Sequence, residues 1–193
     1  MSHESLVWVL NKPYGVICQF GEHEKHPSLK KYVPIPDVYP AGRLDTDSEG
    51  LLLLTDDGQL QAKIAHPKYK MEKTYWAQVE GSVHDAGLAM LRQGVDLGDF
   101  VTQPANIRVL HHTDTAALWP REPPIRVRQT VPDFWLEIRI REGKNRQVRR
   151  MCARAGWPCL RLVRIGIGPF NVLDLKLALG ECRRIPMPQW HGL

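Results

Sequence analysis

Three carboxylates within five residues are the feature of this sequence best able to do chemistry. Asp45, Asp47 and Glu49 lie between Arg43 and the apolar run 51–54. A carboxylate in front of a buried strand is either a turn-forming acid or a reacting group that must stay ionised. The spacing of the three acids does not show which of them, if any, reacts. Two of them could also serve a glycosidase-type hydrolase, which divides the acid and base roles between two carboxylates.

A dense run of arginines is the second chemically informative segment. On a helix, Arg146, Arg150 and Arg154 recur every four residues and form a basic ridge, while Arg149 lies one step round, at the edge of the apolar face. Gly143-Lys144 stands where a strand meets this helix, where backbone N–H groups attract phosphate. The segment predicts either a solvated basic face or a surface that binds nucleic acid. The second interpretation draws on four arginines of the neighbouring strands, which we expect to widen the ridge into a stripe: Arg139, Arg141, Arg161 and Arg164.

Composition sets the broad class of the protein. The 193 residues are 43% hydrophobic and 24% charged, as in a soluble globular protein, and the net charge of +5 suits a polyanionic partner. The four scattered cysteines form no C-x-x-C pair, which favours reduced thiols in a cytoplasmic protein. No apolar run is long enough to span a membrane, and Ser2-His3-Glu4-Ser5 lacks the basic start of a signal peptide.

The apolar patterns predict an α+β fold with a mainly antiparallel sheet and flanking helices. Strands are expected at 6–10, 16–20, 51–54, 73–79, 134–141 and 160–165, with a turn at 11–15. Helices are expected near 28–32, after Thr55-Asp56-Asp57-Gly58, at 84–93 and at 145–155. We expect one domain over residues 1–193, either as a single compact unit or as two subdomains around a cleft. Because the first strand begins at Leu6, no additional N-terminal domain is expected.

Four short motifs carry a resemblance to a known family. They are Asn11-Lys12-Pro13-Tyr14-Gly15-Val16, Gly42-Arg43-Leu44-Asp45, Lys73-Thr74-Tyr75 and Gly143-Lys144-Asn145-Arg146-Gln147-Val148-Arg149-Arg150-Met151. In this order they resemble the motifs of RsuA-like RNA pseudouridine synthases, over residues 6–186. The resemblance implies the pseudouridine synthase catalytic fold with a central cleft, without the N-terminal S4 domain that members often carry. It also implies isomerisation of uridine to pseudouridine with no cofactor and no metal.

The resemblance divides the roles among the three acids. It implies that Asp45 is the catalytic aspartate, which attacks the target nucleoside at the sugar or at the base. Arg149 matches the basic residue that keeps this carboxylate charged and oriented, and Tyr75 the tyrosine that stacks on the uracil and assists proton transfer at carbon 5. We expect the three to line one cleft, with Asp47 and Glu49 pointing away as turn residues, Glu49 in solvent.

Further residues are expected to bind the substrate RNA. Arg43 would wedge into the RNA or hold a phosphate, unless it only pairs with Asp47 on the surface. Lys12 is expected as a structural or backbone contact beside the pocket, and Leu160 or Leu162 as its apolar wall. The phosphate contacts are assigned to Lys144, Arg146, Arg150 and Arg164.

The expected partner is ribosomal RNA, because the segment 43–52 is most similar to members that act on 23S rRNA. The enzyme would flip the uridine out of its stack, on free rRNA or in a pre-ribosomal particle, as a monomer and without a membrane. The proline-rich basic loop 120–133 is either a further RNA contact or a disordered insertion. The alternatives are a synthase for another structured RNA, a non-catalytic module for RNA binding or ribosome assembly, and a carbohydrate hydrolase.

Overall fold

The computed structural model describes residues 7–186, except residues 70 and 127. Residues 2–5, on which the expectation about a signal peptide rests, therefore lie outside the described residues. The chain divides into two compact units: unit 1 takes in Met1–Met71 and Phe170–Leu193, and unit 2 is Glu72–Pro169.

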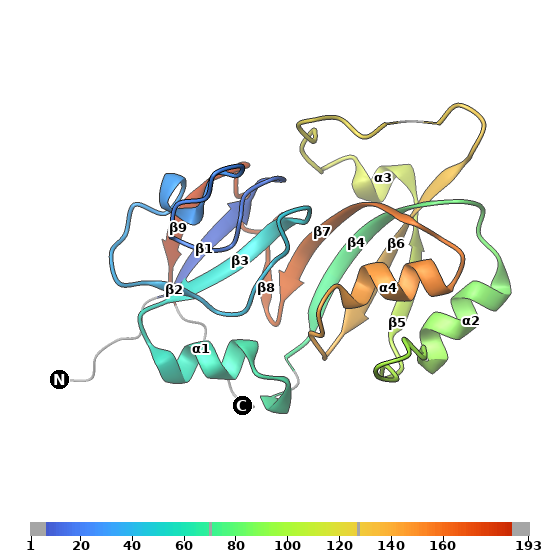
Figure 1. The fold of residues 1–193 in the computed structure, drawn as a ribbon, viewed down its shortest axis with the longest axis horizontal. Coiled ribbons are helices and arrows are strands. Elements are labelled where there is room, and N and C mark those ends of the chain that lie inside the picture. The colour runs from blue at the N-terminus through green and yellow to red at the C-terminus, as the bar shows by residue number, and fades with distance from the viewer. Residues whose placement is uncertain (1–6, 70, 127, 187–193) are drawn as a thin grey trace. The chain divides into compact units, whose positions relative to one another are not determined.

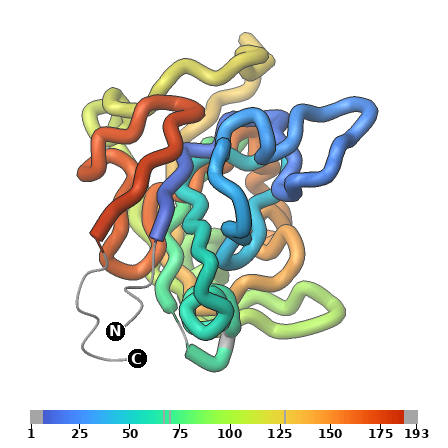
Figure 2. Tube along the Cα trace, turned by 90° about the vertical axis from the view of Figure 1, so that its left-hand side faces the viewer, coloured from blue at the N-terminus to red at the C-terminus, as the bar shows by residue number. Residues whose placement is uncertain are grey.

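Unit 1 joins the two ends of the described chain in one antiparallel sheet. β3 (Glu49–Thr55) pairs with β1 (Val7–Lys12) and β2 (Tyr39–Pro40), and β1 also pairs with β9 (Cys182–Ile185). The blue β1 and the red β9 therefore run side by side (Figures 1 and 2). The shorter elements are η1 (Leu29–Lys31), α1 (Gly58–Ala65), η2 (Pro67–Tyr69) and β8 (Phe170–Asn171).

The predicted strand and helix at the centre of unit 1 are confirmed. Every residue of β3 is buried, as a continuous apolar run indicates. Asp57 caps α1, accepting hydrogen bonds from the backbone N–H groups of Gln59 (2.8 Å) and Leu60 (3.2 Å). Leu60 and Ile64, one turn apart, form the buried face of this helix.

Unit 2 is an antiparallel sheet in the order β5–β6–β4–β7. Its strands are β4 (Lys73–Glu80), β5 (Asn106–Leu110), β6 (Asp133–Ile140) and β7 (Cys159–Ile167). Its helices are α2 (Asp85–Gln93), α3 (His112–Thr115) and α4 (Gln147–Arg154). The expected α+β class with a mainly antiparallel sheet is confirmed.

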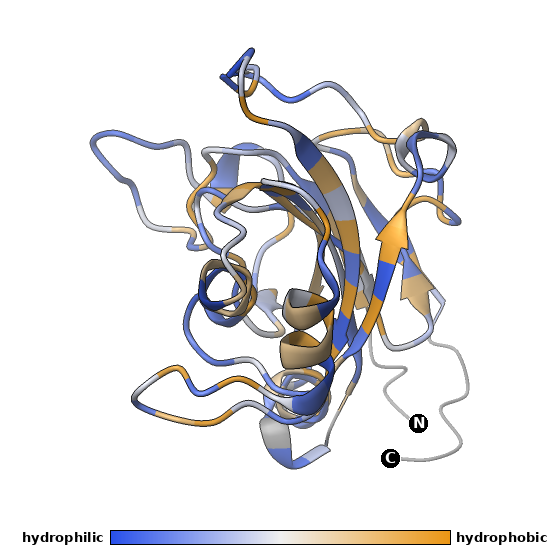
Figure 3. Cartoon of the chain, turned by 90° about the vertical axis from the view of Figure 1, so that its right-hand side faces the viewer, coloured by the Kyte–Doolittle hydropathy of each residue, from blue (hydrophilic) through white to orange (hydrophobic). Residues whose placement is uncertain are grey.

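The sheet of unit 2 has two unlike faces. Leu136, Ile138 and Ile140 of β6 share a core cluster with Leu91 of α2 and Met151 of α4. We call this side the helix face. Glu137 and Arg139, which alternate with these residues along β6, point to the opposite side of the sheet, which we call the second face. Hydrophobic and hydrophilic residues accordingly alternate as stripes along the long strands (Figure 3).

Two predictions near the N-terminus are wrong. Residues 16–20 do not form a strand; Ile17 makes a single bridge to Ser28. The predicted turn at 11–15 begins too early, because β1 continues through Asn11 and Lys12, both fully buried. Asn11 belongs in the strand because its Nδ2 donates to the carbonyl of Leu177, 3.2 Å away and 166 residues along the chain. The sequence around Asn11 shows only that Asn11 and Lys12 are polar, and it does not indicate this distant partner.

Other boundaries follow from backbone geometry. α4 begins at Gln147, two residues later than predicted, because Arg146 adopts a left-handed conformation with φ of 51°. The segments β2, β5, β8, β9, α3 and η2 were not predicted. β2 and β8 have two residues each, too few for a periodic signal.

Candidate active site

Two of the four motifs meet within unit 1. The backbone N–H of Gly15 donates to the carbonyl of Thr46 at 2.8 Å, which ties the segment 11–16 to the acidic turn. The turn itself is closed by the N–H of Ser48, which donates to the carbonyl of Asp45 at 3.0 Å. Gly15 and Thr46 are 31 residues apart in sequence but adjacent in space, and their contact holds the backbone next to Asp45 in place.

Burial separates the three acids where spacing could not. Asp45 and Asp47 are half-buried, while Glu49 is 1% exposed. The expectation that Glu49 is a solvated turn acid is therefore wrong. The reason is that Glu49 is already the first residue of β3, a strand that is buried along its whole length. Asp45 remains on the turn with part of its surface accessible.

Arg43 is exposed and lines a cavity of about 470 Å³ within unit 1. The other lining residues are Cys18, Gln19, Pro40, Gly42 and Gln61. Gln61 is held in place by its Nε2, which donates to the carbonyl of Pro40 at 2.9 Å.

Lys12 has a structural role in the described residues. Its side chain is fully buried, and Nζ donates to the carbonyls of Pro13 (3.0 Å) and Val16 (2.8 Å). These bonds close the turn that carries the first motif, which agrees with the structural role expected for Lys12. A contact between Lys12 and substrate stays a prediction.

Unit 2 brings Tyr75 and Arg164 together. They are paired residues of β4 and β7, so their side chains lie on the same face of the sheet. Tyr75 is also paired with Ile138 and packs against the core cluster, which places it on the helix face. Arg164 is 4% exposed there. Leu162 belongs to the core, while Leu160 is half-buried.

Arg149 lies where the helical spacing placed it, half-buried at the edge of the apolar face of α4. Its Nη1 donates to the carbonyl of Cys159 at 3.4 Å. Val148, Met151 and Cys152 form the buried face of the helix, as predicted. Arg149 therefore reaches from α4 to the start of β7.

The remaining cations of the arginine segment differ in their surroundings. Arg146 and Arg154 are exposed. Arg150 donates to the carboxylate of Asp99 and, at 3.0 Å, to the carbonyl of Leu97, so it also fastens α4 to that loop. Lys144 is exposed, with Nζ 5.6 Å from the centroid of the Phe100 ring.

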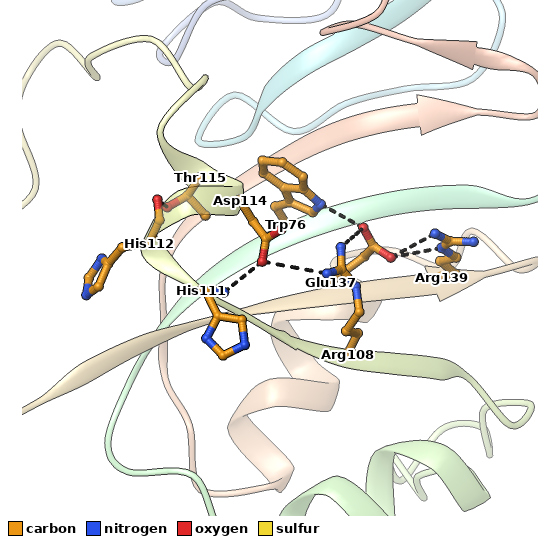
Figure 4. Close-up of polar contacts among 8 residues, drawn as sticks. All are labelled: Trp76, Arg108, His111, His112, Asp114, Thr115, Glu137 and Arg139. Carbon is orange, nitrogen blue, oxygen red and sulfur yellow. Dashed lines mark hydrogen bonds and ion pairs between the residues drawn. The ribbon is translucent and has the colours of Figure 1, made fainter.

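The expected stripe of arginines is split between the two faces of the sheet. Arg139 follows the alternation of β6 onto the second face, where it donates to Glu137 at 2.9 Å (Figure 4). Arg164 is paired with Tyr75 and therefore lies on the helix face. Arg161 is paired with Gln78, three residues further along β4, and therefore lies on the second face. A run of basic residues on a strand reaches both faces, because successive side chains point to opposite sides.

Glu137 organises the second face (Figure 4). It is 7% exposed and accepts hydrogen bonds from Trp76 Nε1 at 3.0 Å, Arg108 Nη2 at 3.3 Å and Arg139 Nη2 at 2.9 Å. Burial acts to raise the pKa of Glu137, but these donors outweigh it and hold the pKa below its usual value. A single carboxylate thus connects β4, β5 and β6.

The basic loop 120–133 is fastened to the sheet at several points, with residue 127 outside the described part. Arg161 Nη2 donates to the carbonyl of Trp119 at 2.9 Å, just before the loop, and Arg121 Nη1 to that of Leu160 at 3.3 Å. Arg128 pairs with Glu80 at 3.3 Å. An RNA contact by this loop stays a prediction.

Lys73 is a largely buried residue that opens the third motif, although the sequence analysis assigned it no role. It is 8% exposed, and burial together with the nearby Arg164 lowers its pKa to about 8. The sequence did contain a signal for its position. Lys73 and Tyr75 are two residues apart on one predicted strand, so their side chains are expected on the same face of the sheet. Its pairing with Ile140, a member of the core cluster, confirms that Lys73 lies on the helix face.

The described residues were considered for metal-binding clusters and for membrane-spanning helices. Between residues 7 and 186, leaving out 70 and 127, no cluster of three His, Cys, Asp or Glu side chains could hold a metal ion. Over the same residues, no helix has the length and apolar character needed to cross a membrane. Cys18, Cys152, Cys159 and Cys182 are free thiols, as expected.

Comparison with known proteins identifies the family. The family model for RNA pseudouridylate synthase matches residues 6–154. The chain belongs to the RNA pseudouridine synthase family. A solved pseudouridylate synthase that is 32% identical superposes with a TM-score of 0.75, covering 94% of this chain and 70% of the other. This similarity confirms the expected fold, and as a pseudouridine synthase the protein is an isomerase.

Several curated relatives are similar over most of their length. The ribosomal large subunit pseudouridine synthase E of Xanthomonas campestris is 54% identical over 87% of this chain and 90% of its own length. The protein of the same name from Vibrio vulnificus is 48% identical over 96% of this chain and 77% of its own. The ribosomal small subunit pseudouridine synthase A of Salmonella typhimurium is 36% identical, with coverages of 94% and 71%.

The predicted catalytic residues come from both units. Asp45 belongs to unit 1, and Tyr75 and Arg149 belong to unit 2. That the three line one cleft, with Asp47 pointing away, stays a prediction.

Proposed function

We propose that this protein converts a specific uridine of 23S ribosomal RNA to pseudouridine. The observation that carries the proposal is the 54% identity to a ribosomal large subunit pseudouridine synthase over 90% of that protein's length. A uridine in another structured RNA is the second candidate, because a small-subunit synthase is 36% identical. The net charge of +5 suits either polyanionic substrate.

In the proposed reaction, Asp45 acts on the flipped nucleoside. The bond between N1 and C1′ breaks, the uracil turns, and a bond forms between C5 and C1′. The proton lost from C5 is balanced by the proton that N1 gains, so the product is an isomer of the substrate. Asp45 attacks either C1′ of the sugar or the base, and both routes require an ionised carboxylate.

Arg149 and Tyr75 support Asp45 in this proposal. A guanidinium beside a partly desolvated carboxylate favours the ionised form, and Arg149 is proposed to supply it. The half-buried ring of Tyr75 is proposed to stack on the uracil, with its hydroxyl group assisting proton transfer at C5. No step needs a cofactor or a metal.

Substrate capture is proposed to rely on several cations and one apolar wall. Arg43, beside its cavity, would enter the RNA or hold a phosphate after the uridine has left the stack. The other phosphate contacts would come from Lys144, Arg146, Arg150 and Arg164. Leu160 would form part of the apolar wall, while Leu162 supports it from the core.

The molecular setting follows from this substrate. We propose that residues 1–193 act as a single catalytic domain, made of the two compact units. The protein would work as a monomer in the cytoplasm, where ribosomal RNA is made and assembled. Free 23S rRNA and a pre-ribosomal particle are both candidate substrates.

The decisive experiment maps pseudouridine in 23S rRNA from cells with and without the gene, and in transcripts treated with purified protein. One uridine should depend on the protein in both assays. Asp45→Asn should lower the rate of conversion by a factor on the order of 10³ or more, as loss of a nucleophile does. Asp47→Asn, which changes a half-buried acid of the same turn, is the matched control and should retain most of the activity.

The outcomes separate the candidate functions. Full activity of Asp45→Asn would overturn the assigned mechanism. A dependent uridine in 16S rRNA would move the protein to the second candidate substrate. Salt-sensitive RNA binding by the unmutated protein with no pseudouridine formed would show a non-catalytic module.

A further inference from the structure

The cavity beside Arg43 carries hydrogen-bonding side chains that have no part in the proposed reaction. Two residues of its lining, Gln19 and Gln61, are amides, and each amide offers both a donor and an acceptor. Gln19 is exposed, whereas Gln61 is half-buried on α1. A ligand in this cavity therefore meets one mobile and one restrained amide.

A hydrogen bond fixes the orientation of the Gln61 amide. Its Nε2 donates to the carbonyl of Pro40 at 2.9 Å, and a carbonyl oxygen can only accept. Rotating the amide by half a turn would replace this bond with two acceptors in contact. Gln61 thus keeps Oε1 as an acceptor for a ligand, on a helix that is fixed by its Asp57 cap and its buried face.

The rest of the lining suits a flat ring. The guanidinium group of Arg43 is planar and stacks on aromatic rings and bases. Cys18 and Pro40 add apolar surface, and Gly42, with φ of 87°, has no side chain to fill the space. A ring that stacks on one side and forms hydrogen bonds at its edge describes a nucleobase.

The cavity and the proposed nucleophile belong to the same short segment of unit 1. Arg43 precedes Asp45 by two residues, which separate their Cα atoms by at most about 7 Å. The turn is held by the bonds of Gly15 to Thr46 and of Ser48 to Asp45. The sugar-phosphate link between neighbouring nucleotides is of similar length, so the nucleotide next to the one at Asp45 can reach the cavity.

We propose that this cavity binds the base of a nucleotide directly adjacent to the target uridine. The proposal rests on the proposed function and deepens it by assigning a second base site, in which Gln61 distinguishes between bases. Flipping the uridine out removes a stacking partner from its neighbours. A site that stacks and hydrogen-bonds one neighbour offsets this loss and makes the choice of uridine depend on the flanking sequence.

The first test compares base preference in the unmutated protein and in Gln61→Met, which keeps the side-chain length and removes the amide. The substrate is an rRNA fragment around the uridine identified by mapping, with the base on one side of it changed in turn. The unmutated protein should show KM values that differ roughly tenfold between the best and the worst neighbouring base. Gln61→Met should show similar KM values for all four, with kcat little changed.

Gln59→Met, an exposed glutamine of the same helix outside the cavity, is the matched control and should keep the full preference. Each RNA is assayed with every protein, so effects of a base change on the RNA itself cancel. Equal preference in Gln61→Met and the unmutated protein would overturn the assignment, as would an unmutated protein indifferent to both neighbours.

The second test needs no substitution, so it holds even if Gln61→Met fails to fold. 4-Thiouridine, placed in turn on either side of the target uridine, cross-links on irradiation to the protein groups that it touches. One position should cross-link to the peptide containing Cys18 and Gln19 or to that containing Gln61. Cross-links from both positions to other peptides alone would overturn the proposal.

The outcomes keep this proposal apart from the proposed function. Pseudouridine formation with no dependence on either neighbouring base would refute the base site and leave the proposed function intact. If no uridine is converted, 4-thiouridine distributed over the fragment still reports on the cavity. Cross-links there would support the base site while the proposed function fails.

Discussion

Single residues in unit 2 show that the neighbours of a buried charged group decide why its pKa shifts. Glu137 and Lys73 are exposed to nearly the same small extent, 7% and 8%. Glu137 receives donors from three strands, and its pKa falls; Lys73 faces another cation, and its pKa falls because the charged form is disfavoured. The first arrangement is typical of a structural network, whereas in the second burial and a like charge both disfavour the ionised form.

Glu137→Gln tests the structural network. Because the folded-state pKa of Glu137 lies below its unfolded value, its stabilisation is present above the unfolded pKa and is lost as the pH falls through the folded pKa. We expect the variant to lose about 2–3 kcal/mol of unfolding free energy at pH 7, with a smaller difference below pH 4. Urea unfolding at both pH values measures this.

The matched control is Glu80→Gln, which breaks an ion pair with an arginine side chain that is 65% exposed. It should cost less than about 1 kcal/mol. A loss for Glu137→Gln that is equally small, or that does not change with pH, would contradict the network.

Among the elements, α2 illustrates how tertiary packing overrides local propensity. Gly87 lies inside this helix, where alanine is usually favoured by about 1 kcal/mol. A Cβ atom at Gly87 would lie 2.5 Å from Cη2 of Trp157 and 2.7 Å from Cε1 of His84. Trp157 is 1% exposed, so its ring has no room to move. His84 is exposed, but moving it away would break the capping hydrogen bond that its Nδ1 accepts from Gly87 N–H at 2.9 Å.

We therefore expect Gly87→Ala to destabilise the protein by about 1–3 kcal/mol despite its better helix propensity. Urea unfolding, followed by tryptophan fluorescence, measures the change. Gly58→Ala at the first turn of α1 is the control, since no atom lies within 4 Å of its added Cβ. It should be neutral or slightly stabilising, and a gain of stability in Gly87→Ala would show that the helix can shift.

For the whole molecule, the division of arginines between the faces of the unit 2 sheet decides which of them can bind RNA together. Arg146 is exposed on the helix α4 side, whereas Arg108 lies on the second face in contact with Glu137 and Asp114. Net positive charge alone would make the two equivalent. Their different locations predict that, of these two arginines, Arg146 contacts RNA and Arg108 does not.

The salt dependence of RNA affinity measures this difference. Arg146→Gln should reduce the slope of log K against log salt by about 0.7–0.9, the contribution of one phosphate contact. Arg108→Gln removes the same charge from the second face and should leave the slope unchanged. Equal effects of the two substitutions would mean that RNA follows net charge and not the helix face.

Local sequence determined much of this protein. Apolar residues that recur with the helical period of 3.6 residues were sufficient to predict α4 and the position of Arg149 at the edge of its apolar face. The strand period of 2 residues was sufficient to predict the alternation of β6. Both patterns depend only on neighbours along the chain. Four ordered motifs were sufficient to identify the family that the comparisons confirm.

Tertiary structure decided the environments of the charged groups. It buried Glu49 in β3, turned Lys12 onto the carbonyls of its own turn, and separated Arg139 from Arg164. It also left Lys73 facing a second cation beside Tyr75. Burial and partners arise from strand pairings between distant segments, so the same lysine or glutamate in the sequence becomes a structural contact or a ligand site only when the sheet assembles.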